Sequence, residues 1–296
     1  MPSNEQRRQA AKRKLERQLA RRVERAKRRK RRMALGSGIA VVVVILVVFG
    51  IVFLTTNHGT SSAASTTTTT AAPPVKTSGG PCKYTSTPSQ PAPKGKNEGL
   101  ATDPKPTPNT GAVTVTLQTS QGNIPLNLNR ADAPCTVQSF VYLAQKTYFD
   151  GTPCHRLTAD PGLSVLQCGD PTGTGQGGPG YTIPDEKPKN LKAAPTTTPP
   201  QQGQQAADIY PAGTIAMANT GQPHSGGSQF FLVYADTQLP PDYTVFGTVG
   251  PEGMTTLHKI VAGGIIPGTD PSTGQPTTMD GKPKLPVNIT KAVVSS

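Results

Sequence analysis

The sequence predicts a mainly β domain, residues 111–296, that follows one membrane-spanning helix and a polar linker. Many short apolar segments, separated by turns containing Gly and Pro, succeed one another in the C-terminal part of the chain. Only two segments there have the 3.6-residue periodicity of a helix. Many short strands with two isolated helices favour a closed β-barrel or a sandwich with helical plugs.

Positive charge is concentrated at the N-terminus. Residues 1–32 contain 15 of the 30 Lys and Arg residues but only 3 of the 17 Asp and Glu residues. The net charge of +13 therefore belongs to this tail, and we expect no nucleic-acid binding by the nearly neutral remainder. Leu15, Leu19 and Val23 recur at helical spacing, which suggests a basic amphipathic helix. We expect the tail, residues 1–34, to contact anionic lipid headgroups. Binding of RNA or another acidic partner in the cytoplasm is the alternative.

Residues 35–54 have the length of a transmembrane helix. They carry no charge, and 20 residues at about 1.5 Å each span the ~30 Å hydrocarbon core of a bilayer. A signal peptide has a shorter apolar core, about 7–15 residues, so an uncleaved anchor is favoured, although SSAAS at 61–65 leaves cleavage open. By the positive-inside rule the tail is cytoplasmic and everything after Leu54 lies outside the membrane.

Residues 55–110 are predicted to form a disordered, extended stalk. They are rich in Thr, Ser, Pro and Ala and cannot bury enough apolar surface to offset the entropy of ordering. All four Cys lie beyond the predicted span, which fits an oxidising compartment and two disulfides in one of three pairings. We favour Cys154–Cys168, because these residues flank a short strand–turn–strand. Cys82 would then pair with Cys135 and fasten part of the stalk.

The elements of the domain follow from local patterns. Residues 112–128 alternate around SQGN and predict a β-hairpin. Residues 133–149 place apolar side chains on one helical face, with Pro134 at the start. Residues 253–263 predict a second helix that ends at Gly263. Short strands are expected at 154–158, 164–170, 213–219, 228–234, 243–249 and 287–294, and a long polar loop at 187–207.

Motifs of several enzyme classes are missing or lack their context. GTGQGG at 173–178 matches GxGxxG, but PGYTIPDE follows it instead of the helix that a dinucleotide site needs. The chain has no P-loop and no GxSxG elbow. His155 could ligate a metal with Cys154 and Cys168, but outside the cytoplasm a disulfide is the expected use of these thiols. We therefore expect neither a metal nor a cofactor.

The remaining polar candidates include no nucleophile. The segments FDGTPCHRL, LQCGDPTGTGQGGPGY, GTIAMANT, GGSQFFL and YTVFGTV occur in this order. Together they resemble the cyclophilin family of peptidyl-prolyl cis-trans isomerases, in a membrane-anchored bacterial form, over most of residues 111–296. The resemblance implies an eight-stranded antiparallel closed barrel capped by two α-helices. It also implies that proline is recognised in a groove on the outer surface of the barrel.

The resemblance assigns roles to individual residues. Arg156 matches the catalytic arginine, and Gln167 would position it or the substrate carbonyl. Phe231 would form the floor of the proline pocket, and Asn219 would offer backbone hydrogen bonds to the peptide. The other residues expected to bind substrate are Ala218, Gln229, Val165, Ser164, Leu239 and Tyr243.

The sequence also departs from the family. Counting back from Gln167, Ser164 replaces the pocket Phe and Val165 replaces a Met. Three extra residues follow Arg156, so Leu163 could take the place of Ser164. Tyr243 replaces a pocket His, and the chain lacks the family's Trp, beside whose position Leu239 falls.

These residues suit an enzyme that breaks no bond. Rotation about an X–Pro amide has a barrier near ~20 kcal/mol, and a site accelerates it by binding the twisted amide more tightly than the planar forms. We expect a monomeric isomerase that accelerates the folding of exported proteins, with proline-containing polypeptides as clients. The alternative is a weakly catalytic or non-catalytic module that binds proline-containing segments.

Overall fold

The structure is a computed structural model that describes residues 74–96, 99–195, 205–269 and 275–295. The predicted basic tail (1–34) and transmembrane helix (35–54) lie outside these residues. Within the described ranges, none of the helices has the length and apolar character needed to cross a bilayer.

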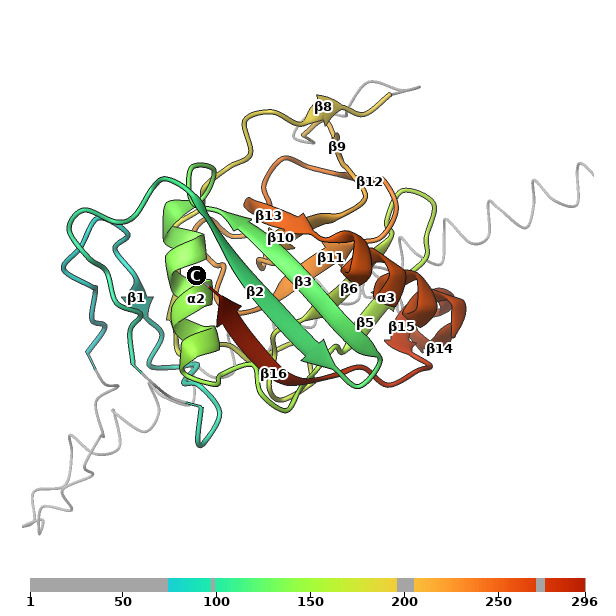
Figure 1. Ribbon diagram of the computed structural model, residues 1–296, viewed down its shortest axis with the longest axis horizontal. Coiled ribbons are helices and arrows are strands. Elements are labelled where there is room, and N and C mark those ends of the chain that lie inside the picture. The colour runs from blue at the N-terminus through green and yellow to red at the C-terminus, as the bar shows by residue number, and fades with distance from the viewer. Residues whose placement is uncertain (1–73, 97–98, 196–204, 270–274, 296) are drawn as a thin grey trace, which may run out of the picture. The chain divides into compact units, whose positions relative to one another are not determined.

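An antiparallel sheet of 11 strands forms the body of the domain (Figure 1). The order of its strands is β14-β15-β5-β6-β11-β10-β13-β3-β2-β16-β4. The predicted hairpin at 112–128 is confirmed as β2 and β3, and the six predicted strands are confirmed as β5, β6, β10, β11, β13 and β16. The bounds are β2 Ala112–Thr119, β3 Gly122–Asn129, β4 Thr152–Pro153, β5 Arg156–Thr158, β6 Val165–Cys168, β10 Thr214–Met217, β11 Phe230–Val233, β13 Val245–Val249, β14 Ile265–Thr269, β15 Pro276–Pro283 and β16 Asn288–Ser295.

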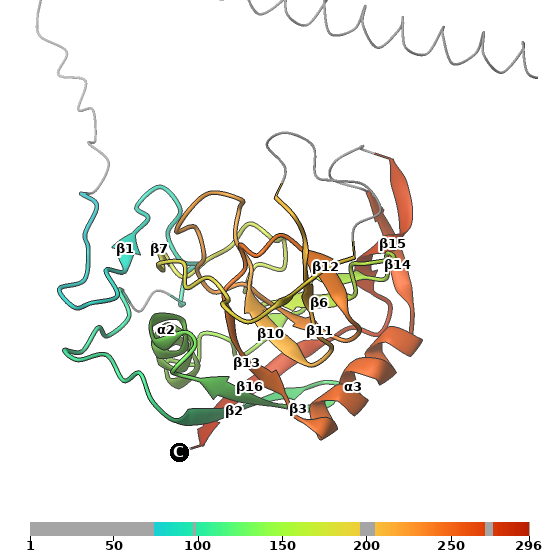
Figure 2. The ribbon, with the colours of Figure 1, turned by 90° about the horizontal axis from the view of Figure 1, so that it is seen from above.

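The predicted closed eight-stranded barrel is wrong in strand number and in closure. The sheet is a curled half-barrel, and its edge strands β14 and β4 do not pair with each other in the described part of the chain. The edge of β5 that could close a barrel pairs with β15 instead. The two residues between β4 and β5 connect the two ends. The Cys154 N–H donates to the Val287 carbonyl at 2.8 Å, whereas the His155 N–H donates to the Gln167 carbonyl at 3.1 Å. One bend of the chain therefore joins the two halves of the sheet. The β14–β15 hairpin, on the right in Figure 2, extends the sheet beyond β5 (Figure 1).

Two short sheets flank the large one. One contains β1 (Thr85–Ser86) and β7 (Tyr181–Thr182), and the other contains β12 (Thr237–Leu239), β9 (Asp208–Tyr210) and β8 (Lys192–Ala193). Strands of two or three residues are too short for a periodic pattern, which is why the sequence did not predict most of them.

Both predicted helices are confirmed. Helix α2 (Pro134–Gln145) packs against β16, and α3 (Pro251–Ala262) packs against β3. Each begins with a proline, whose missing N–H is not needed in the first turn. The first turn of α2 is completed by Glu186, 50 residues away. Its carboxylate accepts the N–H groups of Cys135 and Thr136 at 2.9 and 2.8 Å, where it also interacts favourably with the helix dipole.

Residues 74–110 differ from the disordered stalk predicted for 55–110. A disulfide joins Cys82 to Cys135, and the Tyr84 hydroxyl donates to the Cys135 carbonyl at 2.7 Å. Both Cys82 and Tyr84 are fully buried, and β1 pairs with β7. One crosslink and one buried aromatic ring therefore hold this segment on the domain, although its composition is typical of disorder.

Apolar side chains form two clusters on opposite faces of the central strands. Along β11, Phe230 and Leu232 belong to the main core, which also contains the buried faces of the two helices. Phe231 and Val233 belong to a smaller cluster with Val165, Tyr210 and Ala216. Because successive side chains of a strand point to opposite faces, the smaller cluster lies on the outer face of the sheet.

Candidate functional site

The strand register brings the main candidates into one row. Arg156 of β5 is opposite Gln167 of β6, which is opposite Phe231 of β11. Phe231 is in turn opposite Ala216 of β10. Cross-strand partners project from the same face, so the sheet places a guanidinium, an amide and an aromatic ring side by side next to the smaller apolar cluster.

Two tyrosine rings, Tyr243 and Tyr210, lie beside Phe231 at one end of this row. Phe231 is 5% exposed, and its ring lies edge-on to Tyr243, with 5.4 Å between the centroids and an interplanar angle of 82°. Tyr210 lies 6.5 Å from Phe231 and 6.3 Å from Tyr243. Burial raises the pKa of the Tyr243 phenol, and the positive charge of Arg156 lowers it in part.

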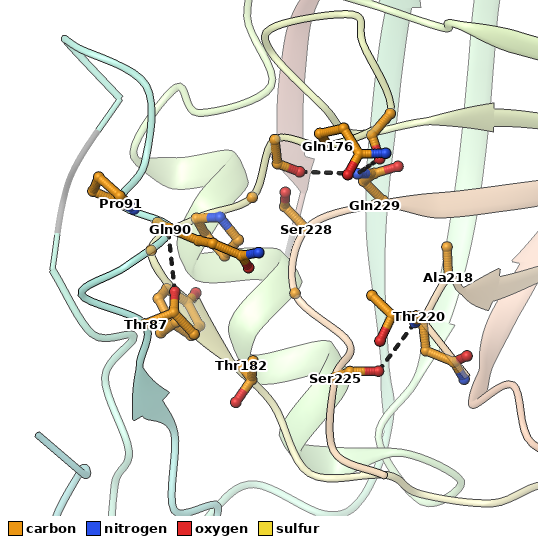
Figure 3. Close-up of a pocket in the computed structure, with 18 of the residues that line it drawn as sticks. Thr87, Gln90, Pro91, Gln176, Thr182, Ala218, Thr220, Ser225, Ser228 and Gln229 are labelled. Carbon is orange, nitrogen blue, oxygen red and sulfur yellow. Dashed lines mark hydrogen bonds between the residues drawn. The ribbon is translucent and has the colours of Figure 1, made fainter. Parts of the chain in front are cut away.

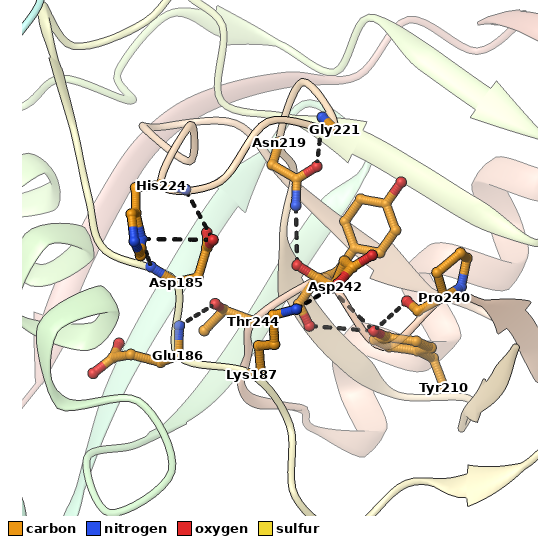
Figure 4. A network of polar contacts seen from close by, with 11 residues as sticks. Asp185, Glu186, Lys187, Tyr210, Asn219, Gly221, His224, Pro240, Asp242 and Thr244 are labelled. Atoms are coloured by element: carbon orange, nitrogen blue, oxygen red, sulfur yellow. Dashed lines mark hydrogen bonds and ion pairs between the residues drawn. The ribbon is translucent and has the colours of Figure 1, made fainter. Parts of the chain in front are cut away.

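Tyr210 was not among the predicted site residues. Its hydroxyl donates to the carbonyls of Pro240 and Tyr243 at 3.0 and 3.3 Å, which fixes the loop before β13 (Figure 4). It follows the long polar loop and belongs to no motif. A single aromatic residue after that loop was the only sequence signal.

Arg156 is held by a carboxylate that the sequence analysis also missed. Its Nε and Nη2 donate to Oδ1 and Oδ2 of Asp280 at 2.8 and 2.6 Å. Its Nη1 donates to Gln167 Oε1 at 3.4 Å. Hydrogen bonding to Asp280 outweighs burial and raises the pKa of Arg156 above its ordinary value, so the side chain remains cationic.

Two glutamines form a hydrogen-bonded relay that ends at Arg156. Gln229 Nε2 donates to the carbonyls of Gly175 and Gly177 at 3.0 and 2.9 Å, and Gln167 Nε2 donates to Gln229 Oε1 at 2.9 Å. Because the glycine carbonyls only accept, Gln229 must turn its NH2 toward them and its oxygen toward Gln167. Gln167 must then turn its own oxygen toward Arg156. The direction of every amide in the relay is therefore determined.

Asp170 holds the glycine-rich loop that supplies these carbonyls. Its buried carboxylate accepts the N–H groups of Thr172, Gly175 and Gly177 at 2.7, 2.7 and 3.1 Å. Burial raises the pKa of Asp170, but the hydrogen bonds from Thr172 and the loop N–H groups outweigh it, so the net pKa is lowered. A Cβ atom at position 177 would overlap the carboxylate. The GxGxxG match is thus a loop wrapped around an aspartate.

Asn219 uses its side chain to fasten its own loop. Nδ2 donates to the Asp242 carbonyl at 3.0 Å, and Oδ1 accepts the Gly221 N–H at 3.0 Å (Figure 4). Its backbone N–H and carbonyl have no hydrogen-bond partner within the described ranges. The expectation that Asn219 offers its backbone to a peptide stays a prediction.

A cavity of about 300 Å³ adjoins the relay (Figure 3). Its walls come from three parts of the chain: the glycine-rich loop, the loop around Asn219, and the segment predicted as stalk. Among its lining residues are Gln167, Gln229, Ala218, Asn219, Thr87, Gln90 and Pro91. Part of the predicted linker therefore borders the site.

Leu163, Val165 and Leu239 meet at the smaller apolar cluster, which contains Phe231. Val165 is a buried member of the cluster, and Leu163 and Leu239 pack against it half-buried. The Ser164 N–H donates to Thr237 Oγ1 at 3.0 Å, and the Ser164 carbonyl accepts the Tyr234 N–H at 3.1 Å. Leu163, the alternative that the extra residues allowed, contacts the cluster.

The second disulfide joins Cys154 to Cys168 beside the row. With Cys82–Cys135, this is the pairing that the sequence analysis favours. Within the residues that the structure describes, no three His, Cys, Asp or Glu side chains are grouped to hold a metal ion.

A curled antiparallel sheet with an Arg–Gln–Phe row on its outer face defines a cyclophilin-type protein. The family profile described as cyclophilin type peptidyl-prolyl cis-trans isomerase/CLD matches residues 114–294. The chain therefore belongs to the cyclophilin-type peptidyl-prolyl cis-trans isomerase family.

Curated relatives extend this result. A Mycobacterium leprae protein named "Probable peptidyl-prolyl cis-trans isomerase B" is 49% identical over 98% of both chains. A Mycobacterium tuberculosis protein of the same name is 44% identical over 73% of this chain, but the match spans only 64% of that relative's length. A crystal structure of a Cryptosporidium parvum cyclophilin in the presence of the dipeptide Ala-Pro is 26% identical over 62% of this chain and 99% of its own, with a TM-score of 0.45.

Proposed function

We propose that the domain catalyses the cis–trans isomerisation of X–Pro peptide bonds in polypeptide clients. The observation that carries this proposal is the row of Arg156, Gln167 and Phe231 across three strands, bordered by Tyr243. It combines a cationic donor with an apolar aromatic surface, and these are the two groups that recognition of a twisted prolyl amide requires.

The mechanism follows from the electronic structure of the amide. Twisting the C–N bond removes its resonance and places a lone pair on the prolyl nitrogen. The Phe231 surface holds the proline ring, and Arg156 donates to the nitrogen or to the adjacent carbonyl. A charge-assisted hydrogen bond contributes about 1.5–3 kcal/mol, which at ~1.36 kcal/mol per tenfold is one or two decades in rate. Fixing the ring while the rest of the peptide turns must supply the remainder.

The proposed setting is the outer side of a membrane. The basic tail, the uncharged residues 35–54 and the two disulfides support an anchored, extracytoplasmic domain. Uncatalysed X–Pro isomerisation takes tens to hundreds of seconds, slow enough to limit the folding of exported proteins. Protease added outside intact cells should therefore release the domain, and a domain that is protected there would contradict this placement.

A binding module is the second candidate. One observation favours it: the segment before Gln167 brings Leu163 and Val165 to the smaller apolar cluster, in place of the Phe and Met that the resemblance implies. Such a module would hold proline-containing segments and hardly turn them over.

Isomerisation of a proline tetrapeptide by the full-length chain in detergent separates the two candidates. Arg156→Ala should lower kcat/KM by about 10- to 100-fold, and Arg156→Lys, which keeps the charge but loses the planar fork, should lower it less. Arg130→Ala is the matched control, because Arg130 follows β3, five strands from β5 in the sheet. Equal rates for the wild type and Arg156→Ala would favour the binding module.

A further inference from the structure

The β14–β15 hairpin contains an irregularity next to the site. Its register passes from Pro267 opposite Gly281 to Gly268 opposite Thr277. Three residues of β15, ending with Asp280, therefore bulge away from β14. A Cβ atom at position 281 would overlap the Ile266 carbonyl, so glycine at 281 lets the two strands approach closely beside the bulge.

The bulged residues bind to β5 instead. Asp280 is opposite Thr158, and the Met279 carbonyl accepts the Ala159 N–H at 2.7 Å. This pairing attaches the hairpin to the strand that begins with Arg156. Bulges re-aim side chains, and here the bulge directs a carboxylate of β15 toward the guanidinium of β5.

The resulting ion pair is bidentate and largely shielded from water on its acidic side. The Arg156 Nη2 and Asp280 Oδ2 atoms are 2.6 Å apart, and the two side chains are 34% and 12% exposed. A bidentate pair of this kind fixes the plane of the guanidinium as well as its position. By comparison, the 3.4 Å bond to Gln167 is long and leaves that plane free to rotate.

Asp280 leaves part of the guanidinium available. An arginine has five N–H donors. Within the described part of the chain, three of them have acceptors: Nε and one N–H of Nη2 at Asp280, and one N–H of Nη1 at Gln167. One N–H on each terminal nitrogen remains, directed away from the carboxylate. The ion pair therefore orients Arg156 without occupying the two guanidinium N–H groups that can donate to a substrate.

We propose that Asp280 is a positioning residue for isomerisation, acting through Arg156. Without Asp280, the Arg156 side chain, which is one-third exposed, would have to be ordered each time a substrate binds. The proposal rests on the proposed isomerase function and adds a residue supplied by the C-terminal hairpin.

A double-mutant cycle on the full-length chain tests the proposal. Asp280→Asn keeps the shape of the side chain but loses the charge and one acceptor oxygen. It should lower kcat/KM for a proline tetrapeptide about tenfold, chiefly through kcat. In an Arg156→Ala background the same change should have no further effect. Asp280→Glu, which keeps the carboxylate but displaces it, should give an intermediate loss and serves as the second variant if Asp280→Asn does not fold.

Asp160→Asn is the matched control, because in the described part of the chain no hydrogen bond or ion pair joins the Asp160 side chain to Arg156. It should change kcat/KM less than twofold, a factor worth about 0.4 kcal/mol. Wild-type activity in Asp280→Asn, or an equal loss in both backgrounds, would overturn the proposal while leaving the isomerase function intact. Failure of the proposed function itself would show separately, as Arg156→Ala equal to the wild type.

Discussion

Replacing Gln229 with Glu tests the amide relay with almost no change of shape. In the wild type, Gln229 Nε2 donates to two glycine carbonyls, at 3.0 and 2.9 Å. In the variant a carboxylate oxygen faces the same two carbonyls, so two hydrogen bonds become contacts between acceptors. Rotating the carboxylate does not help, because both of its oxygens only accept.

The magnitude follows from the bonds that are lost. Each hydrogen bond contributes about 1 kcal/mol, and two carbonyls then lack a donor, so the free energy of unfolding should fall by roughly 2–3 kcal/mol. For a domain of this size that is a decrease of about 5–10 °C in Tm. Gln167 Nε2 can still donate to the other carboxylate oxygen of residue 229. Gln167 therefore keeps its direction, and kcat/KM should change less than about twofold.

Thermal unfolding and tetrapeptide isomerisation measure the two effects separately. Gln222→Glu introduces the same charge in an exposed loop and should change neither quantity. If Gln229→Glu keeps the wild-type Tm, the hydrogen bonds from Gln229 to the glycine carbonyls do not stabilise the domain. If kcat/KM falls about tenfold, residue 229 does not remain an acceptor for Gln167.

Two further predictions concern carboxylates that accept backbone N–H groups. Glu186→Gln removes acceptor capacity from the first turn of α2 and should lower the free energy of unfolding by about 1–2 kcal/mol, measured by thermal unfolding. Glu252→Gln, in the first turn of α3, is the control and should lower it by less than half as much. The pKa of Asp170 is lowered in the folded state. Its ionised form therefore stabilises the protein at every pH above the pKa of the unfolded state, which is near ~3.9. This stabilisation is lost as the pH falls through the pKa of the folded state. The difference in urea stability between wild type and Asp170→Asn should therefore be largest at pH 7 and shrink below about pH 4, whereas a constant difference would contradict the argument.

Local pattern was sufficient for the hairpin at 112–128, for both helices and for six further strands, but β14 and β15 were not predicted. The hairpin at 112–128 and both helices were predicted because their periodicity and their terminal proline or glycine residues lie within one short segment. Arg156, Gln167 and Phe231 were found through motifs of a family, and the strand register then brought them together. Tyr210 and Asp280 had neither periodicity nor a motif, so nothing in their neighbourhood indicated the site.

Composition was misleading for residues 74–110. Their Thr, Ser and Pro content is typical of a disordered linker. A disulfide from Cys82 and the buried ring of Tyr84 nevertheless hold this segment against the domain, and it contributes Gln90 and Pro91 to the wall of a cavity. Average composition contains no information about one crosslink to a residue 53 positions away.

The sequence by itself determined the family, the helices, the main strands and the chemistry of the Arg156–Gln167–Phe231 row, because these depend on residue type and short-range spacing. Only the tertiary structure decided that the sheet remains open, that a three-residue bulge carries Asp280 to Arg156, and that glycine carbonyls set the direction of the relay. The physical reason is that hydrogen-bond partners far apart in the chain are chosen by the packing of strands, which no local segment encodes.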